Sequence, residues 1–431
     1  MSKDVSNAAA IVSLMGKHSS SAEVQGYGCG ALCNVASSAE NGMVVAANGG
    51  VEAVLGAMVA HGSSAEVQHA GCSALCNLAS DAEVSVAVAA KGGIEAVVKA
   101  MGLHVSKAEV LNSGCSALMA LAVTEKNQLA IAMKGGVEAV VGAMEAHGLN
   151  ERVQEAGCGV LSFLAVNAVN KLVVASKGGI EAVVGAMVGH GLSAQVQHAG
   201  CSALCNLATD SENKVAVAAK GGIAAILGAM GAHKLSAEVQ ETGCSALCNL
   251  AVNEENTVAV VADGGIEVVV AAMGAHLSVA GVQYAGCGTL CVLSKKDEGI
   301  KVAVAAKGGI EAVMGAMGAH SSSAGMQNGA CMALICLASN ADNKVAIAAK
   351  GGIDAVVGAM RAHGSSAEVQ ENGSSLLSSL AADGENKKVI SAKGGVEAVL
   401  KAMEVHGSSE LVQEAGRVAL RDLSDGENQA A

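Results

Sequence analysis

Proline and tryptophan are absent from this chain of 431 residues, which also contains only one Phe and two Tyr. Because proline breaks helix interiors, its absence suits a chain that is nearly all helical. Hydrophobic residues make up 52% of the sequence, so the core must be built from Ala, Val, Leu, Ile, Met and Cys. Side chains this small permit the close approach that stacked helices require.

Basic residues are scarce as well. Lys and Arg number 26 against 39 acidic residues, which gives a net charge of −13, and the basic residues form no cluster. This balance argues against nucleic acid, whose phosphates need clustered cations. A basic protein or peptide is the electrostatically easier partner, although the interpretation we favour is that the acidity confers solubility.

Two stretches without charged residues, 268–294 and 312–341, are long enough to raise the question of a membrane span. A polar turn interrupts each of them, around His276 and around His320, so we expect no membrane insertion. Fourteen cysteines without a secretory signal favour a reducing compartment. We expect the cytoplasm, with the nucleus or the cytoskeleton as alternatives.

A Gly-Gly pair recurs every 43 residues, with a single spacing of 44, from Gly49-Gly50 to Gly394-Gly395. Self-similarity at this period indicates a solenoid of stacked helical units. No linker interrupts the pattern, so we expect one domain over residues 1–431. Its approximate units are 1–48, 49–91, 92–134, 135–177, 178–220, 221–263, 264–307, 308–350, 351–393 and 394–431.

Three helices are predicted in each unit. In the unit chosen as the type, Asn213 begins a short first helix that Gly221 ends, because a left-handed glycine often follows a helix. The second helix runs from Ile223 to Met230, and Ser236 caps a longer third helix with an apolar face.

The repeated order Asn-Lys, Gly-Gly-Ile-x-Ala-Val, Val-Gln and Ala-Leu-x-Asn-Leu-Ala resembles the armadillo-repeat family. The resemblance covers essentially the whole chain in ten units, the first of which lacks its first helix. It implies an all-α, armadillo-type right-handed superhelical solenoid of about ten three-helix repeats. Family members bind extended peptides, or tails and helices of partner proteins, along a concave groove lined by third helices.

In peptide-binding armadillo proteins, an Asn on the third helix grips the peptide backbone, because an amide both donates and accepts hydrogen bonds. The resemblance assigns this role to two adjacent pairs, Asn34 with Asn77 and Asn206 with Asn249. The alternative is that these Asn are relics of the repeat that face water.

The family's Trp, one turn earlier on the third helix, is missing. Small residues stand there in most units, among them Ser73, Ser202 and Ser245, which we include in the predicted groove. Without the indole rings, the aliphatic stems of Lys or Arg ligands lose their packing surface. The departure therefore argues against recognition of a nuclear-localisation signal.

Units seven and eight are the most irregular part of the chain. Gly281 and Gly325 replace the usual Glu, Tyr284 appears, and Met332 follows a cysteine that breaks the third-helix pattern. We hypothesise that this weakly charged region is a surface that contacts other proteins, with Tyr284 and Met332 in it.

Cysteine and histidine form regular columns. All fourteen cysteines fall in third helices, where pairs four apart share a helix face and stacked units could assemble a metal site. We favour packing as small buried hydrophobes. A His ends every second helix, where we expect it to interact with terminal carbonyls; a pH response or metal binding are the alternatives.

Nothing in the chain resembles an active site, since Ser lies in caps and turns and no strand precedes the Gly-Gly pairs. We expect no enzymatic activity, no cofactor, no metal and no small-molecule substrate. The predicted function is a non-enzymatic adaptor or scaffold that binds an extended peptide or partner segment along the third-helix groove. The alternative is a structural subunit of a larger cytoskeletal, ciliary or other multiprotein assembly.

Overall fold

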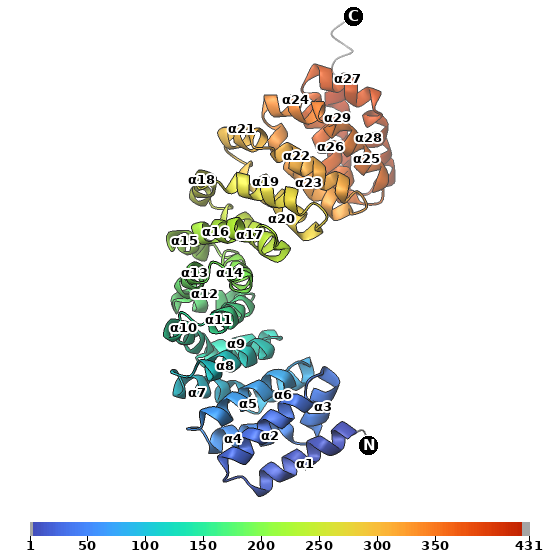
Figure 1. The fold of residues 1–431 in the computed structure, drawn as a ribbon. Coiled ribbons are helices and arrows are strands. Elements are labelled where there is room, and N and C mark those ends of the chain that lie inside the picture. The colour runs from blue at the N-terminus through green and yellow to red at the C-terminus, as the bar shows by residue number, and fades with distance from the viewer. Residues whose placement is uncertain (1–2, 425–431) are drawn as a thin grey trace, which may run out of the picture. The chain divides into compact units, whose positions relative to one another are not determined.

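The computed structural model describes residues 3–424, and the regular structure within them is helical throughout, in 29 α-helices (Figure 1). The chain divides into two compact units, residues 1–225 and 226–431. We call them the N-terminal body and the C-terminal body and describe each by itself. The outer ends of the predicted first and tenth repeats, residues 1–2 and 425–431, lie outside the described residues. That the repeats form one domain stays a prediction.

The helices follow the predicted three-helix order, and the first repeat begins with its second helix. The first helices are α3 (Ala39–Ala47), α6 (Ala82–Ala90), α9 (Glu125–Met133), α12 (Ala168–Ser176), α15 (Ser211–Ala219), α18 (Glu254–Ala262), α21 (Glu298–Ala306), α24 (Ala341–Ala349) and α27 (Gly384–Ala392). The second helices are α1 (Lys3–Lys17), α4 (Gly50–Ala60), α7 (Gly93–Leu103), α10 (Gly136–Ala146), α13 (Gly179–Gly189), α16 (Gly222–Ala232), α19 (Gly265–Ala275), α22 (Gly309–Ala319), α25 (Gly352–Ala362) and α28 (Gly395–Val405). The third helices are α2 (Ala22–Val35), α5 (Ala65–Leu78), α8 (Ala108–Leu121), α11 (Glu151–Leu164), α14 (Ala194–Leu207), α17 (Ala237–Leu250), α20 (Ala280–Leu293), α23 (Ala324–Ala338), α26 (Ala367–Ala381) and α29 (Glu410–Ser424).

Each Gly-Gly pair separates a first helix from a second helix, as predicted. The leading glycine of every pair is left-handed, with φ between 77° and 88°, a conformation that costs other L-residues free energy. The following glycine allows a close approach: a Cβ on Gly179 would lie 2.7 Å from the carbonyl oxygen of Val174. The pair therefore fixes both the end of one helix and the start of the next.

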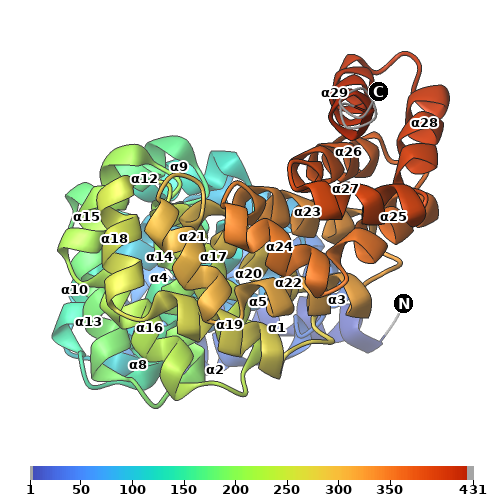
Figure 2. The same ribbon diagram turned by 90° about the horizontal axis from the view of Figure 1, so that it is seen from above.

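Third helices pack on third helices of neighbouring repeats. In the N-terminal body α2, α5, α8, α11 and α14 contact one another in that order, and in the C-terminal body α17, α20, α23, α26 and α29 do the same. Figure 2 shows the succession of α23, α26 and α29 within the C-terminal body. The third helices thus form one face of each body.

Methionines fill the core between second and third helices. Met187 is buried, and a Cβ on Gly200 of α14 would lie 2.7 Å from its sulfur. The same Met–Gly contact recurs in most repeats. The recurring contact shows that one methionine per second helix packs the core, and it shows why glycine stands at this point of the third helix.

A buried glutamine closes the second helix of most repeats. Nε2 of Gln197 donates to the carbonyl oxygens of Met187 at 2.8 Å and His190 at 3.0 Å. These carbonyls lie at a helix end, where the backbone has no partner within the helix. The sequence shows this glutamine in the Val-Gln motif, but its role emerges only from the fold.

The histidine column links consecutive repeats. The backbone N–H of His190 closes α13 as its C-cap, while ring Nε2 lies 2.8 Å from the carbonyl oxygen of Gly148 in the preceding turn. Equivalent contacts 42 or 43 residues apart recur at His61, His104, His147, His276, His320, His363 and His406. The predicted interaction with carbonyls is confirmed, but the acceptor belongs to the preceding turn rather than to the histidine's own helix.

One predicted cap is wrong. The side chain of Asp210, not Asn213, caps α15 by accepting from the N–H groups of Glu212 and Asn213. Asn213 is buried instead, and its Nδ2 donates to the carbonyl oxygen of Lys171 at 3.2 Å. Both residue types make good caps, so the local sequence does not show which of them lies at the helix start.

Ion pairs also connect helices one repeat apart. A lysine precedes seven of the nine Gly-Gly pairs and reaches the acidic residue at the start of an earlier second helix, as Lys220 does with Glu181 at 2.7 Å. The hydrogen bond from Lys220 lowers the pKa of the Glu181 carboxyl. Both side chains are about half exposed, so each pair adds at most about 1 kcal/mol.

Among residues 3–424, no helix combines the length and apolar character needed to cross a membrane, although five bent helix pairs satisfy these two criteria jointly.

Candidate protein-binding groove

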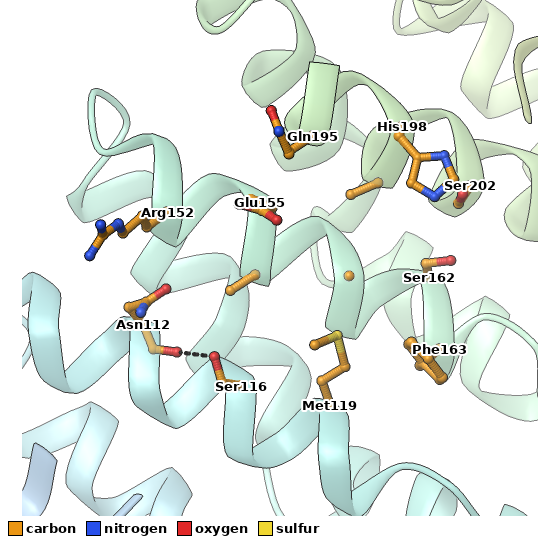
Figure 3. Close-up of a pocket in the computed structure, with 13 residues that line it drawn as sticks. Asn112, Ser116, Met119, Arg152, Glu155, Ser162, Phe163, Gln195, His198 and Ser202 are labelled. Carbon is orange, nitrogen blue, oxygen red and sulfur yellow. Dashed lines mark hydrogen bonds between the residues drawn. The ribbon is translucent and has the colours of Figure 1, made fainter. Parts of the chain in front are cut away.

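The third-helix face of the N-terminal body carries a hollow of about 600 Å³ across α8, α11 and α14 (Figure 3). We call it the α8–α11–α14 groove. Arg152 and Asn112 lie at one end, and Phe163 lies at the other. Its lining residues are Asn112, Ser116, Met119, Arg152, Glu155, Ala156, Gly159, Ser162, Phe163, Gln195, His198, Ala199 and Ser202.

Small side chains produce the hollow. Ser116, Gly159 and Ser202 stand where peptide-binding armadillo proteins carry Trp, and Ala156 also lines the hollow. At Gly159 the space is tight on one side, because a Cβ there would lie 3.0 Å from the sulfur of Met119. Absent indole rings therefore leave room for a ligand on this part of the face.

Polar groups border the groove. Within residues 3–424, the side chains of Asn112, Arg152, Glu155 and Gln195 form no hydrogen bond or ion pair. The hydroxyl of Ser116, by contrast, donates to the carbonyl oxygen of Asn112 at 3.0 Å. The free amides and charges are available to a bound polypeptide.

The predicted Asn residues take part in contacts between repeats. Nδ2 of Asn77 donates to the carbonyl oxygen of Cys33 at 2.9 Å, and Nδ2 of Asn206 donates to that of Ser162 at 3.1 Å. Each bond spans 44 residues and joins consecutive third helices. Each amide nitrogen also lies 3.2 Å from a side-chain acceptor of the same residue, Cys33 Sγ or Ser162 Oγ, so both amides donate within the fold.

Asn34 differs from these, because its side chain is exposed and forms no hydrogen bond with any residue from 3 to 424. Asn249 is half-buried on α17 in the C-terminal body. Their role in ligand binding stays a prediction.

Of the three predicted serines, only Ser202 lines the α8–α11–α14 groove. Ser73 on α5 and Ser245 on α17 are half-buried elsewhere on the third helices. In the C-terminal body, Tyr284 on α20 is 61% exposed and Met332 on α23 is 45% exposed. A contact surface around these two residues is compatible with their exposure and remains a hypothesis.

The centre of the groove was not predicted from the sequence. The predicted site is centred on the retained Asn residues, whereas the hollow lies in the repeats where Ala120 and Phe163 replace them. The signal that was present is the run of small residues at the Trp position, together with the charges of Arg152 and Glu155 on the same face.

Cysteine packing agrees with the favoured interpretation. The first cysteine is buried in each of the eight third helices that contain one, and burial raises the pKa of the Cys115 and Cys158 thiols to about 12. No group of three or more His, Cys, Asp or Glu that could hold a metal occurs within the described range 3–424.

Stacked three-helix repeats with a hollowed third-helix face define a helical repeat protein of the solenoid class. A family model described as the LRRK2 ARM repeat matches residues 309–430. No curated protein sequence matches the chain.

Solved structures extend the likeness over the full length. A crystal structure of an engineered protein from the Northeast Structural Genomics Consortium is 26% identical, with a TM-score of 0.84 over 98% of this chain and 99% of that one. A second engineered protein is 26% identical, with a TM-score of 0.50 over 56% of this chain and 96% of that one.

A β-catenin structure, from work on the interaction between cadherin and β-catenin, is 15% identical, with a TM-score of 0.67 over 97% of this chain and 94% of that one. At this identity the likeness shows the fold alone. Together with the family model over residues 309–430, it supports an armadillo-type repeat fold for this chain.

Proposed function

We propose that this protein is a non-enzymatic interaction scaffold whose α8–α11–α14 groove binds an extended segment of a partner protein. The groove itself carries the proposal, because it combines an open volume with free amides and charges on the third-helix face. The armadillo fold supports it, since such folds are typically protein-interaction scaffolds and generally not enzymes. The β-catenin structure concerns one such interaction, with cadherin.

The size of the groove suits a short extended segment. Neighbouring helices pack about 8–10 Å apart, so three third helices span about 20 Å, or about six residues of extended chain. The amides of Asn112 and Gln195 suit the ligand backbone, while Met119 and Phe163 suit an apolar side chain.

Charge supports a partner with basic groups. Glu155 in the groove offers a carboxylate, and the net charge of −13 attracts cationic segments over a longer range. Asn206, whose Nδ2 donates to Ser162 of the groove lining, offers its side-chain carbonyl oxygen to the same ligand as an acceptor. The proposal further places the protein in the cytoplasm, where its fourteen cysteines would stay reduced.

The test is a selection of peptides of about twelve residues, twice the span of the groove, on the full chain. Affinities of the selected peptides are then measured by fluorescence anisotropy. Arg152→Glu is expected to change the affinity of most of them by roughly tenfold, which corresponds to ~1.4 kcal/mol. The matched control is Lys126→Glu, the same charge change at an exposed residue of α9 outside the groove. Equal effects of the two variants would remove the groove assignment.

A second function, as a subunit of a larger assembly, is favoured by one observation. Leu149 and Leu192 are 97% and 95% exposed, at turns between second and third helices in consecutive repeats of the N-terminal body. Such an apolar edge suits lateral contact with another protein. If Leu149→Asp with Leu192→Asp releases the protein from a complex in native extract while Arg152→Glu does not, the subunit function is the correct one.

A further inference from the structure

Two cysteines of the C-terminal body face each other across a helix–helix contact. Cys291 near the end of α20 and Cys336 near the end of α23 place their sulfur atoms 3.3 Å apart. Both residues are half-buried, so small molecules can reach them. A disulfide needs a sulfur–sulfur distance of about 2.05 Å, so a shift of little more than about 1 Å would close the bond.

The pair exists because one residue of the repeat has been exchanged. In two repeats of the N-terminal body, an Asn at this point of the third helix reaches back to the preceding third helix: Asn77 contacts Cys33, and Asn206 contacts Ser162. In unit eight this residue is Cys336, and the position it reaches is Cys291. At this position Asn77 and Asn206 donate a hydrogen bond from an amide, whereas Cys336 brings a thiol against the thiol of Cys291.

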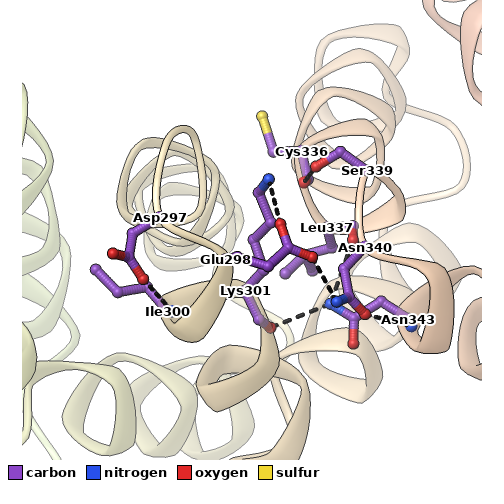
Figure 4. A network of polar contacts seen from close by, with 9 residues as sticks. All are labelled: Asp297, Glu298, Ile300, Lys301, Cys336, Leu337, Ser339, Asn340 and Asn343. Carbon is purple, nitrogen blue, oxygen red and sulfur yellow. Dashed lines mark hydrogen bonds and ion pairs between the residues drawn. The ribbon is translucent and has the colours of Figure 1, made fainter.

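The surroundings are electropositive. Lys301 of α21 is only 8% exposed, and its ammonium pairs with Glu298 at 3.0 Å, beside Cys336 (Figure 4). Lys295 follows the end of α20. The hydrogen bond from the Cys291 thiol, aided by Lys295 and Lys301, lowers the pKa of Cys336 to about 7. By contrast, burial raises the pKa of Cys33, the cysteine that Asn77 contacts.

We propose that Cys291 and Cys336 form a reversible dithiol–disulfide site that reacts with low-molecular-weight disulfides such as oxidised glutathione. The Cys336 thiolate attacks one sulfur of the small disulfide RSSR, whose S–S bond breaks and releases RS⁻. The Cys291 sulfur then loses its proton, attacks the Cys336 sulfur and displaces the second RS⁻. The two protein thiols are oxidised, RSSR is reduced, and both thiol protons end on two RSH molecules.

The product links α20 to α23 and closes a loop of 45 residues. The site is independent of the α8–α11–α14 groove, which lies in the N-terminal body. A binding experiment on the groove and an oxidation experiment on this pair can therefore fail separately.

The experiment is peptide mapping by mass spectrometry of the folded full chain after incubation with oxidised and reduced glutathione in defined ratios. We expect a linkage between Cys291 and Cys336 that returns to two thiols when reduced glutathione is in excess. In C291S, which cannot resolve the first product, Cys336 is expected to accumulate as a glutathione adduct. Failure to detect the linkage under excess oxidised glutathione, in protein with unchanged helicity, would overturn the proposal.

Two further measurements separate a reactive pair from a merely close one. At neutral pH, Cys336 is expected to react with iodoacetamide on the order of tenfold faster than Cys33, and Lys295→Met is expected to slow Cys336 by severalfold without altering Cys33. The N77C variant places a second cysteine opposite Cys33 at the matching position of the N-terminal body, without the lysines. It is expected to form its linkage more slowly, and equal rates for the two pairs would contradict the role of Lys295 and Lys301.

Discussion

Replacing Asn77 by Ala should weaken the fold, whereas the same change at Asn34 should not. The two residues occupy the same position of their repeats, but only Asn77 donates to a neighbouring helix, at 2.9 Å to the carbonyl oxygen of Cys33. Asn34 is exposed and unbonded within residues 3–424. The comparison isolates the hydrogen bond, because both changes gain the same helix propensity.

A neutral intramolecular hydrogen bond contributes about 0.5–1.5 kcal/mol net, and water replaces part of it because Asn77 is half-buried. We therefore expect Asn77→Ala to be about 1 kcal/mol less stable than Asn34→Ala. With an m-value of about 3 kcal/mol/M for a body of this size, the urea midpoints should differ by about 0.3 M.

The assay is urea unfolding followed by far-ultraviolet circular dichroism, since the chain has no Trp for fluorescence. Because repeat proteins can lose repeats in steps, the midpoint of the earliest transition is compared. Equal midpoints for the two variants, or a lower midpoint for Asn34→Ala, would refute the assignment of Asn77 as a link between repeats.

Further predictions concern glycine and the ion pairs. Gly185→Ala should raise stability by about 0.5–1 kcal/mol, because a Cβ there meets open space. Gly179→Ala should lower it by about 1–3 kcal/mol through the clash with the carbonyl of Val174, and thermal melts of both variants give the two signs. Lys220 lowers the pKa of Glu181, so the stability from this pair is present above the ordinary pKa of Glu and is lost as the pH falls through the lowered value. The destabilisation caused by Lys220→Met, at most about 1 kcal/mol at neutral pH, should therefore vanish at about pH 3 in urea titrations.

The helix pattern was predictable because its signals are local. The glycine that ends a first helix must be left-handed, and Ser236 caps α17 within its own turn. Local signals were not sufficient at the start of α15, where Asp210 is the N-cap and the predicted Asn213 is not. Asn213 is withdrawn into the core by a carbonyl 42 residues earlier, and no local pattern contains that contact.

Contacts one repeat apart were beyond the sequence for a common reason. The ring of His190 reaches Gly148, and Lys220 reaches Glu181, only because stacking sets the phase of neighbouring repeats. His and Lys at the end of a helix, and Glu at the start of one, are each explained by the helix dipole alone. The sequence therefore does not indicate that they also contact a neighbouring repeat. The thiol pair of Cys291 and Cys336 was likewise visible only as a break in spacing.

The sequence predicted which helices line the groove but not which repeats contain it. Third helices were expected to line it, and α8, α11 and α14 do. The retained Asn residues directed attention to other repeats, although their amides serve the stacking of helices in part. A hollow forms where large side chains are absent from adjacent helices. The small residues that form this one come from three repeats, so the hollow is recognised only in the packed structure.

Photocrosslinking of a selected peptide tests the central claim most directly. The peptide carries a benzophenone group, binds the full chain, and is irradiated, and the crosslinked residues are identified by mass spectrometry. The account predicts crosslinks within α8, α11 and α14, at residues such as Met119, Glu155 and Gln195, and a changed crosslinking yield in Arg152→Glu. Crosslinks concentrated instead at the turns around Leu149 and Leu192, and unchanged in that variant, would contradict it.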